Sequence, residues 1–155
     1  MWEGFSFFAG LMGNDDKKCI GIDNFSEFNE PRERFLKHFN FYKSDSHFFY
    51  DMDYGQYFEK VHKLPIGFYL YDGSHKYEDQ LKGLQCAEPF FEKNCIVMID
   101  DTNLKANGEP RAPRRATLDF VKQSRFSYKV LLDKTTRFNG HPTWWNGVMV
   151  LRKYT

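Results

Sequence analysis

Residues 66–75 read IGFYLYDGSH and residues 95–103 read CIVMIDDTN, and these two segments decide the fold. Each begins with an apolar run, which is typical of a buried strand, and acidic residues follow directly after that run. Between them, apolar residues recur at helical spacing over residues 77–92. Strand, crossover helix and strand form a βαβ unit, whose two strands lie parallel in one sheet. Both acidic ends therefore emerge at the same edge, where open α/β sheets bind their ligands.

The rest of the chain also alternates between helix and strand. Helices are predicted at 2–12, 30–38, 54–62 and 114–124, and strands at 18–22, 39–43, 128–132 and 147–151. The turn-rich segment between the last two strands predicts that they pair antiparallel. The fold class is therefore α/β, with a mostly parallel sheet and an antiparallel C-terminal strand pair. A chain of 155 residues is most simply one domain, residues 1–155.

Composition narrows the range of partners and locations. The formal net charge of +1 indicates neither nucleic acid nor a membrane surface as a partner. No apolar run approaches the roughly 20 residues that span a bilayer, and the N-terminus lacks the pattern of a secretory signal. The three cysteines are far apart, without metal-type spacing, which is typical of reduced thiols. These features predict a cytoplasmic protein.

Three carboxylates, those of Asp72, Asp100 and Asp101, converge at the shared sheet edge. Hard divalent cations such as Mg²⁺ prefer carboxylate oxygens, and a bound cation lowers the pKa of a substrate hydroxyl. Because side chains alternate along a strand, both acids of the second cluster reach one ion only if the strand ends at or just before Asp100. Taken singly, each acid is as typical of a turn or a helix cap. Convergence from two strands favours a metal site.

His75 follows Asp72 by three residues, on the loop that leaves the same strand. A neutral imidazole beside an activated hydroxyl is a candidate general base, because its unperturbed pKa lies near working pH. The alternative is a solvent-exposed loop histidine without a role.

Two further acids follow predicted strands on the N-terminal side. Asp23 ends its strand, where an acid can accept hydrogen bonds from the two ribose hydroxyls of a nucleotide. It can equally form a turn or cap a helix. Asp45 follows the predicted strand at 39–43. An Asx turn is the ordinary role of such a residue, and a contact with adenine is the functional alternative.

Three motifs together resemble a known family. GID at 21–23, DGSHKYE at 72–78 and IDD at 99–101 resemble the class I S-adenosylmethionine-dependent methyltransferases. The nearest branch is that of the metal-dependent small-molecule O-methyltransferases, which act on sugars or catechols. The resemblance covers nearly the whole chain and implies a Rossmann-like methyltransferase sheet.

The resemblance also implies roles for individual residues. It implies metal binding by Asp72, Asp100 and Asp101, with His75 as the base. It implies cofactor binding by Gly4, Ser6, Asp23, Asp45 and Asp72. The segment 2–6 resembles only the tail of the family's Gly-rich loop, and no strand precedes it. The sheet is therefore expected to be N-terminally truncated.

The predicted function is transfer of a methyl group from S-adenosylmethionine to a hydroxyl group of a small molecule. Sugars are among the candidate acceptors. Mg²⁺ or another divalent cation would assist. One alternative is a truncated, non-catalytic domain of the same fold that binds the cofactor weakly or not at all. Another is a metal-dependent hydrolase. A gap in the sheet would also favour a homo-oligomer.

Overall fold

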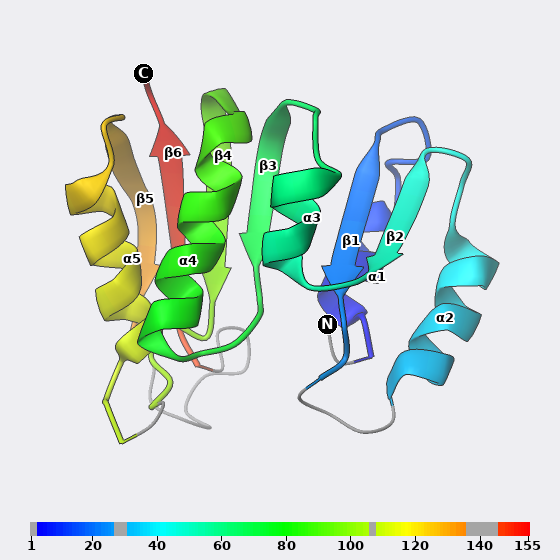
Figure 1. Ribbon diagram of the computed structural model, residues 1–155, viewed down its shortest axis with the longest axis horizontal. Helices are drawn as coiled ribbons and strands as arrows, with labels where there is room; N and C mark the ends of the chain where they lie inside the picture. Colours follow the sequence, from blue (N-terminus) through cyan, green and yellow to red (C-terminus); the bar gives the residue numbers. More distant parts are fainter. Residues whose placement is uncertain (1–2, 27–30, 106–107, 136–145) are drawn as a thin grey trace. The chain divides into compact units, whose positions relative to one another are not determined.

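The computed structural model describes residues 3–26, 31–105, 108–135 and 146–155 (Figure 1). The chain divides into two compact units, Met1–Val61 and His62–Thr155. Each unit has its own sheet and its own buried side chains. That the two units together form one domain, residues 1–155, stays a prediction.

The N-terminal unit contains a two-stranded parallel sheet. Its elements are α1 (Phe5–Leu11), β1 (Cys19–Asp23), α2 (Pro31–Tyr42), β2 (His47–Asp51) and α3 (Tyr54–Lys60). β1 and β2 are in register from Cys19 opposite His47 to Asp23 opposite Asp51. Parallel neighbours need a crossover connection, and α2 provides it.

Phe35 on α2 is the centre of the N-terminal core, and its side chain is fully buried. Its ring centroid lies 5.2 Å from that of Phe8 on α1 and 4.6 Å from that of Phe49 on β2. Phe39 lies one turn further along the same helical face and is also buried. The predicted strand at 39–43 is therefore wrong, because its aromatic residues continue α2 and the strand begins later, as β2.

The C-terminal unit contains a four-stranded sheet. Its elements are β3 (Ile66–Tyr71), α4 (Tyr77–Ala87), the 3-10 helix η1 (Glu88–Phe90), β4 (Phe91–Asp100), α5 (Ala112–Gln123), β5 (Tyr128–Lys134) and β6 (Val148–Lys153). The strands lie in the order β3-β4-β6-β5. β3 and β4 are parallel, whereas β6 is antiparallel to both β4 and β5.

This topology confirms the predicted βαβ unit and the predicted antiparallel pair at the C-terminus. In Figure 1, α4 and α5 lie side by side on one face of the sheet. Both units are α/β, and β1 pairs with β2, and β3 with β4, in parallel, which confirms the mostly parallel, Rossmann-like architecture. The N-terminal truncation stays a prediction.

The core of the C-terminal unit is built from aliphatic and aromatic side chains of the sheet and its two crossing helices α4 and α5. Its fully buried members include Val97, Ile99, Met149, Leu151, Leu84, Ala116 and Phe120. Burying one such side chain contributes about 1.5–3 kcal/mol, so this layer holds the acid-bearing strand ends in place. Across the described residues, no helix is both long enough and apolar enough to cross a membrane.

A close approach between Gly83 on α4 and Tyr71 on β3 shapes the loop that leaves β3. An ideal Cβ on Gly83 would lie 2.1 Å from a ring carbon of Tyr71, so a side chain there has no room. The Tyr71 hydroxyl donates a hydrogen bond to the carbonyl oxygen of Ser74 at 3.2 Å. Because Gly83 has no side chain, the buried ring of Tyr71 packs directly against α4. Its hydroxyl group then holds the loop that carries Asp72 and His75.

None of the three cysteines is in a disulfide, and Cys95 on β4 is almost completely buried. Burial raises the pKa of the Cys95 thiol from 9.0 to about 12. Since the thiolate is the reactive form, we expect iodoacetamide at pH 8 to modify Cys95 only after unfolding. Peptide mapping by mass spectrometry measures this. Labelling of Cys95 in the folded protein as fast as that of the half-buried Cys86 would contradict it.

The same burial predicts a pH dependence of stability. Between pH 9 and about 12 the folded chain keeps the Cys95 proton that the unfolded chain releases. The free energy of unfolding must therefore fall as the pH rises through this window. A Cys95→Ala variant, which lacks the group, is the control, and its unfolding midpoint should fall less steeply over the same range.

Candidate functional site

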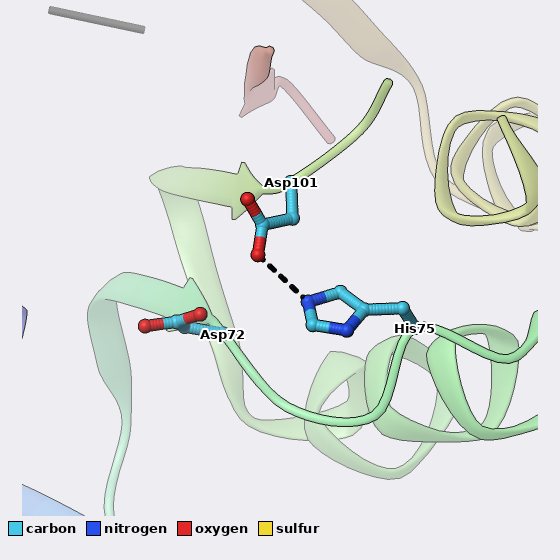
Figure 2. A group of neighbouring side chains, drawn as sticks. All are labelled: Asp72, His75 and Asp101. Carbon is cyan, nitrogen blue, oxygen red and sulfur yellow. Dashed lines mark ion pairs between the residues drawn. The ribbon is translucent and has the colours of Figure 1, made fainter. Parts of the chain in front are cut away.

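Three polar side chains meet at the carboxyl edge of the β3–β4 pair. Asp72 directly follows β3, His75 lies on the loop into α4, and Asp101 directly follows β4. Each offers one atom suited to bind a metal, and these atoms all lie within 4.8 Å of one another. Figure 2 shows the carboxylate of Asp101 turned toward the His75 ring, with Asp72 beside them. Of the four residues predicted to converge here, Asp72, His75 and Asp101 lie together, and Asp100 is not in this group.

The sheet register brings these residues together. Tyr71, the last residue of β3, lies opposite Ile99 on β4, so both strands end at nearly the same level. β4 ends at Asp100, as the metal hypothesis requires. Asp101 then has a φ of 53°, in the left-handed region. This backbone turn ends the alternation of the strand and directs Asp101 toward the loop of β3.

His75 Nε2 lies 2.8 Å from Asp101 Oδ2, and this contact is an ion pair when the imidazole is protonated. The carboxylate can only accept, so Nε2 carries the hydrogen of this contact. The His75 side chain is 30% exposed and that of Asp101 is 21% exposed. His75 is therefore a half-buried, oriented residue, unlike the solvent-exposed loop histidine of the alternative.

Electrostatics keep Asp101 ionised. Burial alone would raise the pKa of its carboxyl, but hydrogen bonds from the side chains of His75 and Asn146, with the charge of His75, lower the pKa overall. An ionised carboxylate can hold a cation or an imidazolium. Asp101 is thus the acid of this group whose surroundings favour the ionised form.

Asp100 has a different environment. Its Oδ1 accepts a hydrogen bond from the backbone N–H of Asp101 at 2.9 Å. Burial, followed by the charges of Asp101 and Asp72, raises the pKa of its carboxyl despite that hydrogen bond. Asp100 is not one of the three residues whose candidate ligand atoms gather within 4.8 Å. Metal binding by Asp100 stays a prediction.

The donor set suits a divalent cation. Two carboxylates provide the oxygen ligands that Mg²⁺ and Mn²⁺ prefer, and the imidazole suits the transition metals better than Mg²⁺. The spread of less than 4.8 Å lets one small ion reach all three residues after minor side-chain adjustment. Asp72, His75 and Asp101 are thus chemically able to hold such an ion.

Asp23 is the last residue of β1, as predicted. Its Oδ1 accepts a hydrogen bond from the backbone N–H of Phe25 at 2.7 Å. Phe25 has a φ of 52°, so Asp23 forms the turn that was the structural alternative. A contact of Asp23 with a cofactor ribose stays a prediction.

The reason for placing Asp45 at a strand end is wrong. Asp45 lies in the turn before β2, at the amino end of that strand. The acid at the carboxyl end of β2 is Asp51, and its carboxylate pairs with Arg32. The error follows from the mistaken strand at 39–43, because the acid that follows a strand is found only when the strand is found. The adenine contact of Asp45 loses its structural basis.

Gly4 and Ser6 are the remaining predicted cofactor residues. Gly4 is buried at the start of α1 with a φ of 85°, and an added Cβ would lie 2.6 Å from the Phe35 ring. This left-handed glycine is the kind of residue that a tight, closely approached loop requires. Ser6 is exposed on α1. Cofactor binding by either residue stays a prediction.

The sequence reasoning missed Asn146. Its side chain forms a hydrogen bond to Asp101, although 45 positions separate the two in the sequence. An Asn-Gly pair before a strand is an ordinary turn signal, so only the β4–β6 pairing reveals this contact.

A family model described as "Methyltransferase domain" matches residues 1–102. This match covers the N-terminal unit, the whole βαβ unit, and the three residues Asp72, His75 and Asp101. No curated protein matches the chain.

Solved structures share the fold at low identity. The chain is similar to an rRNA methylase from Streptococcus thermophilus, with 13% identity, a TM-score of 0.66 and coverage of 100% of this chain and 83% of that one. It is similar to the SAH-bound methyltransferase PaMTH1 from Podospora anserina, with 13% identity, a TM-score of 0.71 and coverage of 99% and 69%. It is also similar to CalS11, a TDP-rhamnose 3'-O-methyltransferase of calicheamicin biosynthesis, with 16% identity, a TM-score of 0.62 and coverage of 97% and 67%.

Proposed function

The chain belongs to the methyltransferase domain family, and we propose that it transfers a methyl group from S-adenosylmethionine to a hydroxyl of a small molecule. One observation carries the proposal: Asp72, His75 and Asp101 gather at the carboxyl edge of the β3–β4 pair, where α/β sheets bind ligands. A base beside two carboxylates is the chemistry that deprotonating a hydroxyl needs.

The net charge of the chain and one of the similar structures support a small-molecule acceptor. A formal net charge of +1 favours a small molecule over RNA, since neutralising phosphates requires an excess of basic residues. Among the similar structures, one acts on a sugar nucleotide, TDP-rhamnose. We therefore place sugar hydroxyls first among the candidate acceptors, and catechols second.

His75 takes the proton of the acceptor hydroxyl, and Asp101 holds the imidazole in a single orientation through Nε2–H. S-adenosylmethionine supplies the methyl group. A divalent cation, if bound by Asp72 and Asp101, would lower the pKa of the acceptor hydroxyl. The metal at this site, Mg²⁺ or another divalent ion, and the ligand role of Asp100 are parts of this proposal.

The test measures release of S-adenosylhomocysteine. The protein is incubated with S-adenosylmethionine and a panel of sugar nucleotides, free sugars and catechols, with Mg²⁺, Mn²⁺ or EDTA. We expect turnover with at least one hydroxyl acceptor and its loss in EDTA. Turnover that is equal with and without EDTA would show that the reaction needs no divalent cation. Absence of turnover with every acceptor would contradict the proposal.

Cofactor binding can be tested separately through Asp23. If Asp23 accepts hydrogen bonds from the ribose, Asp23→Ala should weaken S-adenosylhomocysteine binding about 10-fold or more, the effect of losing hydrogen bonds to a charged group. Isothermal titration calorimetry measures this affinity. Asp15→Ala, which removes an acid elsewhere in the same unit, is the control.

The result of that titration also decides between catalysis and its alternative. An unchanged affinity in Asp23→Ala would remove Asp23 from the cofactor site. No heat from the wild-type chain would favour a domain of this fold that does not catalyse methyl transfer.

A further inference from the structure

The pairing of β4 with β6 continues beyond the ends of both strands. Its last strand pair joins Asp100 to Val148. Beyond it, the backbone N–H of Thr102 donates to the carbonyl oxygen of Gly147 at 3.3 Å, and the N–H of Asn103 donates to that of Asn146 at 2.6 Å. The segment after β4 is thus attached, residue by residue, to the segment before β6.

Gly147 permits this attachment. It has a φ of 84°, and an ideal Cβ there would lie 2.8 Å from the carbonyl oxygen of Lys134 and 2.9 Å from the Cβ of Asn103. A contact this short with the backbone of β5 has no easy relief, and the contact with Asn103 would push the segments after β4 and before β6 apart. Glycine at this position lets the segments after β4 and before β6 approach closely enough for their backbones to form hydrogen bonds.

The side chain of Thr102, in the segment after β4, gives this segment no hydrogen bond of its own within the described part of the chain. Thr102 is fully buried, and its Oγ1 has no hydrogen-bond partner among the described residues. Leaving a buried hydroxyl unpaired is unfavourable. Asp101 adds a left-handed backbone, with a φ of 53°, which few residues other than glycine adopt. Such a conformation persists only where the surroundings impose it.

The side chain of Asn146 supplies part of these surroundings. It hydrogen-bonds to the Asp101 carboxylate, which His75 contacts at 2.8 Å through Nε2. Since a carboxylate can only accept, the amide N–H₂ of Asn146 is the donor. Asp101 is therefore held by two partners, one from the loop after β3 and one from the segment before β6.

We infer that Asn146 is a positioning residue of the site, which orients the Asp101 carboxylate and, through it, the ring of His75. Gly147 lets Asn146 come close enough to do so. The inference deepens the proposed function, on which its catalytic meaning rests. The contact itself can be tested without turnover.

The test compares Asn146→Ala with Asn146→Asp in the full chain. The first removes the donor. The second keeps the shape but sets a like charge against Asp101, so its effect should be larger. The first readout is the proton NMR signal of the His75 Nε2–H group at fixed pH, assigned through its loss in His75→Gln. We expect faster exchange of this proton in both variants, and the more so in Asn146→Asp.

The second readout is the affinity for Mn²⁺, measured by titration calorimetry. Loss of a residue that orients a metal ligand typically costs 10- to 100-fold in affinity, and we expect that range for Asn146→Ala. Asn14→Ala, which removes a surface amide of the N-terminal unit, should leave both readouts unchanged. Far-UV circular dichroism checks that every variant is folded.

The outcomes separate this inference from the proposed function. If the wild-type protein binds no Mn²⁺ but Asn146→Ala still alters the His75 signal, the positioning role stands and the metal part of the proposed function fails. If the His75 signal is the same in the wild-type protein and in both variants, Asn146 does not position the pair and the inference is overturned.

Discussion

An Asp101→Ala variant is expected to lose methyl transfer by about 10²- to 10⁴-fold, the usual effect of removing acid–base catalysis. The structural reason is the 2.8 Å contact between Asp101 Oδ2 and His75 Nε2. Without this partner the imidazole loses the contact that orients Nε2, and the site also loses one of its two gathered carboxylates. The rate of S-adenosylhomocysteine release at saturating acceptor measures the effect.

Two comparisons sharpen this prediction. Asp101→Asn keeps a residue that tolerates the left-handed backbone but removes the charge, so a loss close to that of Asp101→Ala assigns the effect to the carboxylate. Asp133→Ala on β5, which breaks an ion pair with Arg114, should leave the rate nearly unchanged. A wild-type rate in Asp101→Ala would exclude Asp101 from the chemistry.

A Gly83→Ala variant is expected to destabilise the C-terminal unit by about 1–3 kcal/mol, the cost of forcing an extra carbon into a packed core. The new Cβ would lie 2.1 Å from a ring carbon of Tyr71 and 2.7 Å from a second one. The sign of the effect is informative, because alanine is favoured over glycine by up to about 1 kcal/mol inside a helix without such a neighbour. The urea midpoint followed by circular dichroism measures the change.

Gly10 on α1 is the matched control. An ideal Cβ at Gly10 meets nothing within 4 Å, so Gly10→Ala should be neutral or stabilising. Adding Tyr71→Leu to Gly83→Ala should recover part of the loss, since the smaller side chain makes room for the new methyl group. Equal midpoints for Gly83→Ala and wild-type protein would show that the helix moves away from β3 at little cost.

The parts of the fold that could be predicted have strong local patterns. The strand Ile66–Tyr71 and the helix that begins at Tyr77 were placed correctly, because a compact apolar run and a helical repeat are each visible within one segment. The segment 39–43 also has alternating aromatic residues, but there the outcome depends on distant contacts. Phe39 is helical because it packs with Phe35 against the core of its unit. Tertiary packing outweighed the local pattern.

The candidate site shows the same division. Topology alone brings Asp72, His75 and Asp101 to one edge, and this could be predicted from the order of strand, helix and strand. The different surroundings of Asp100 could not be predicted, because they follow from the left-handed backbone of Asp101. The role of Asn146 could not be predicted either, because its contact with Asp101 requires β6 to pair beside β4.

The placement of β6 next to β4 has a consequence for the timing of assembly. A ribosome releases the polypeptide from its amino end, so a growing chain exposes Asp72 and Asp101 well before Asn146 is translated. Until β6 has been made, the outer side of β4 lacks its neighbour, and the Asp101 carboxylate lacks its hydrogen bond from Asn146. The nascent protein therefore completes this corner of the molecule only after Asn146 has been translated.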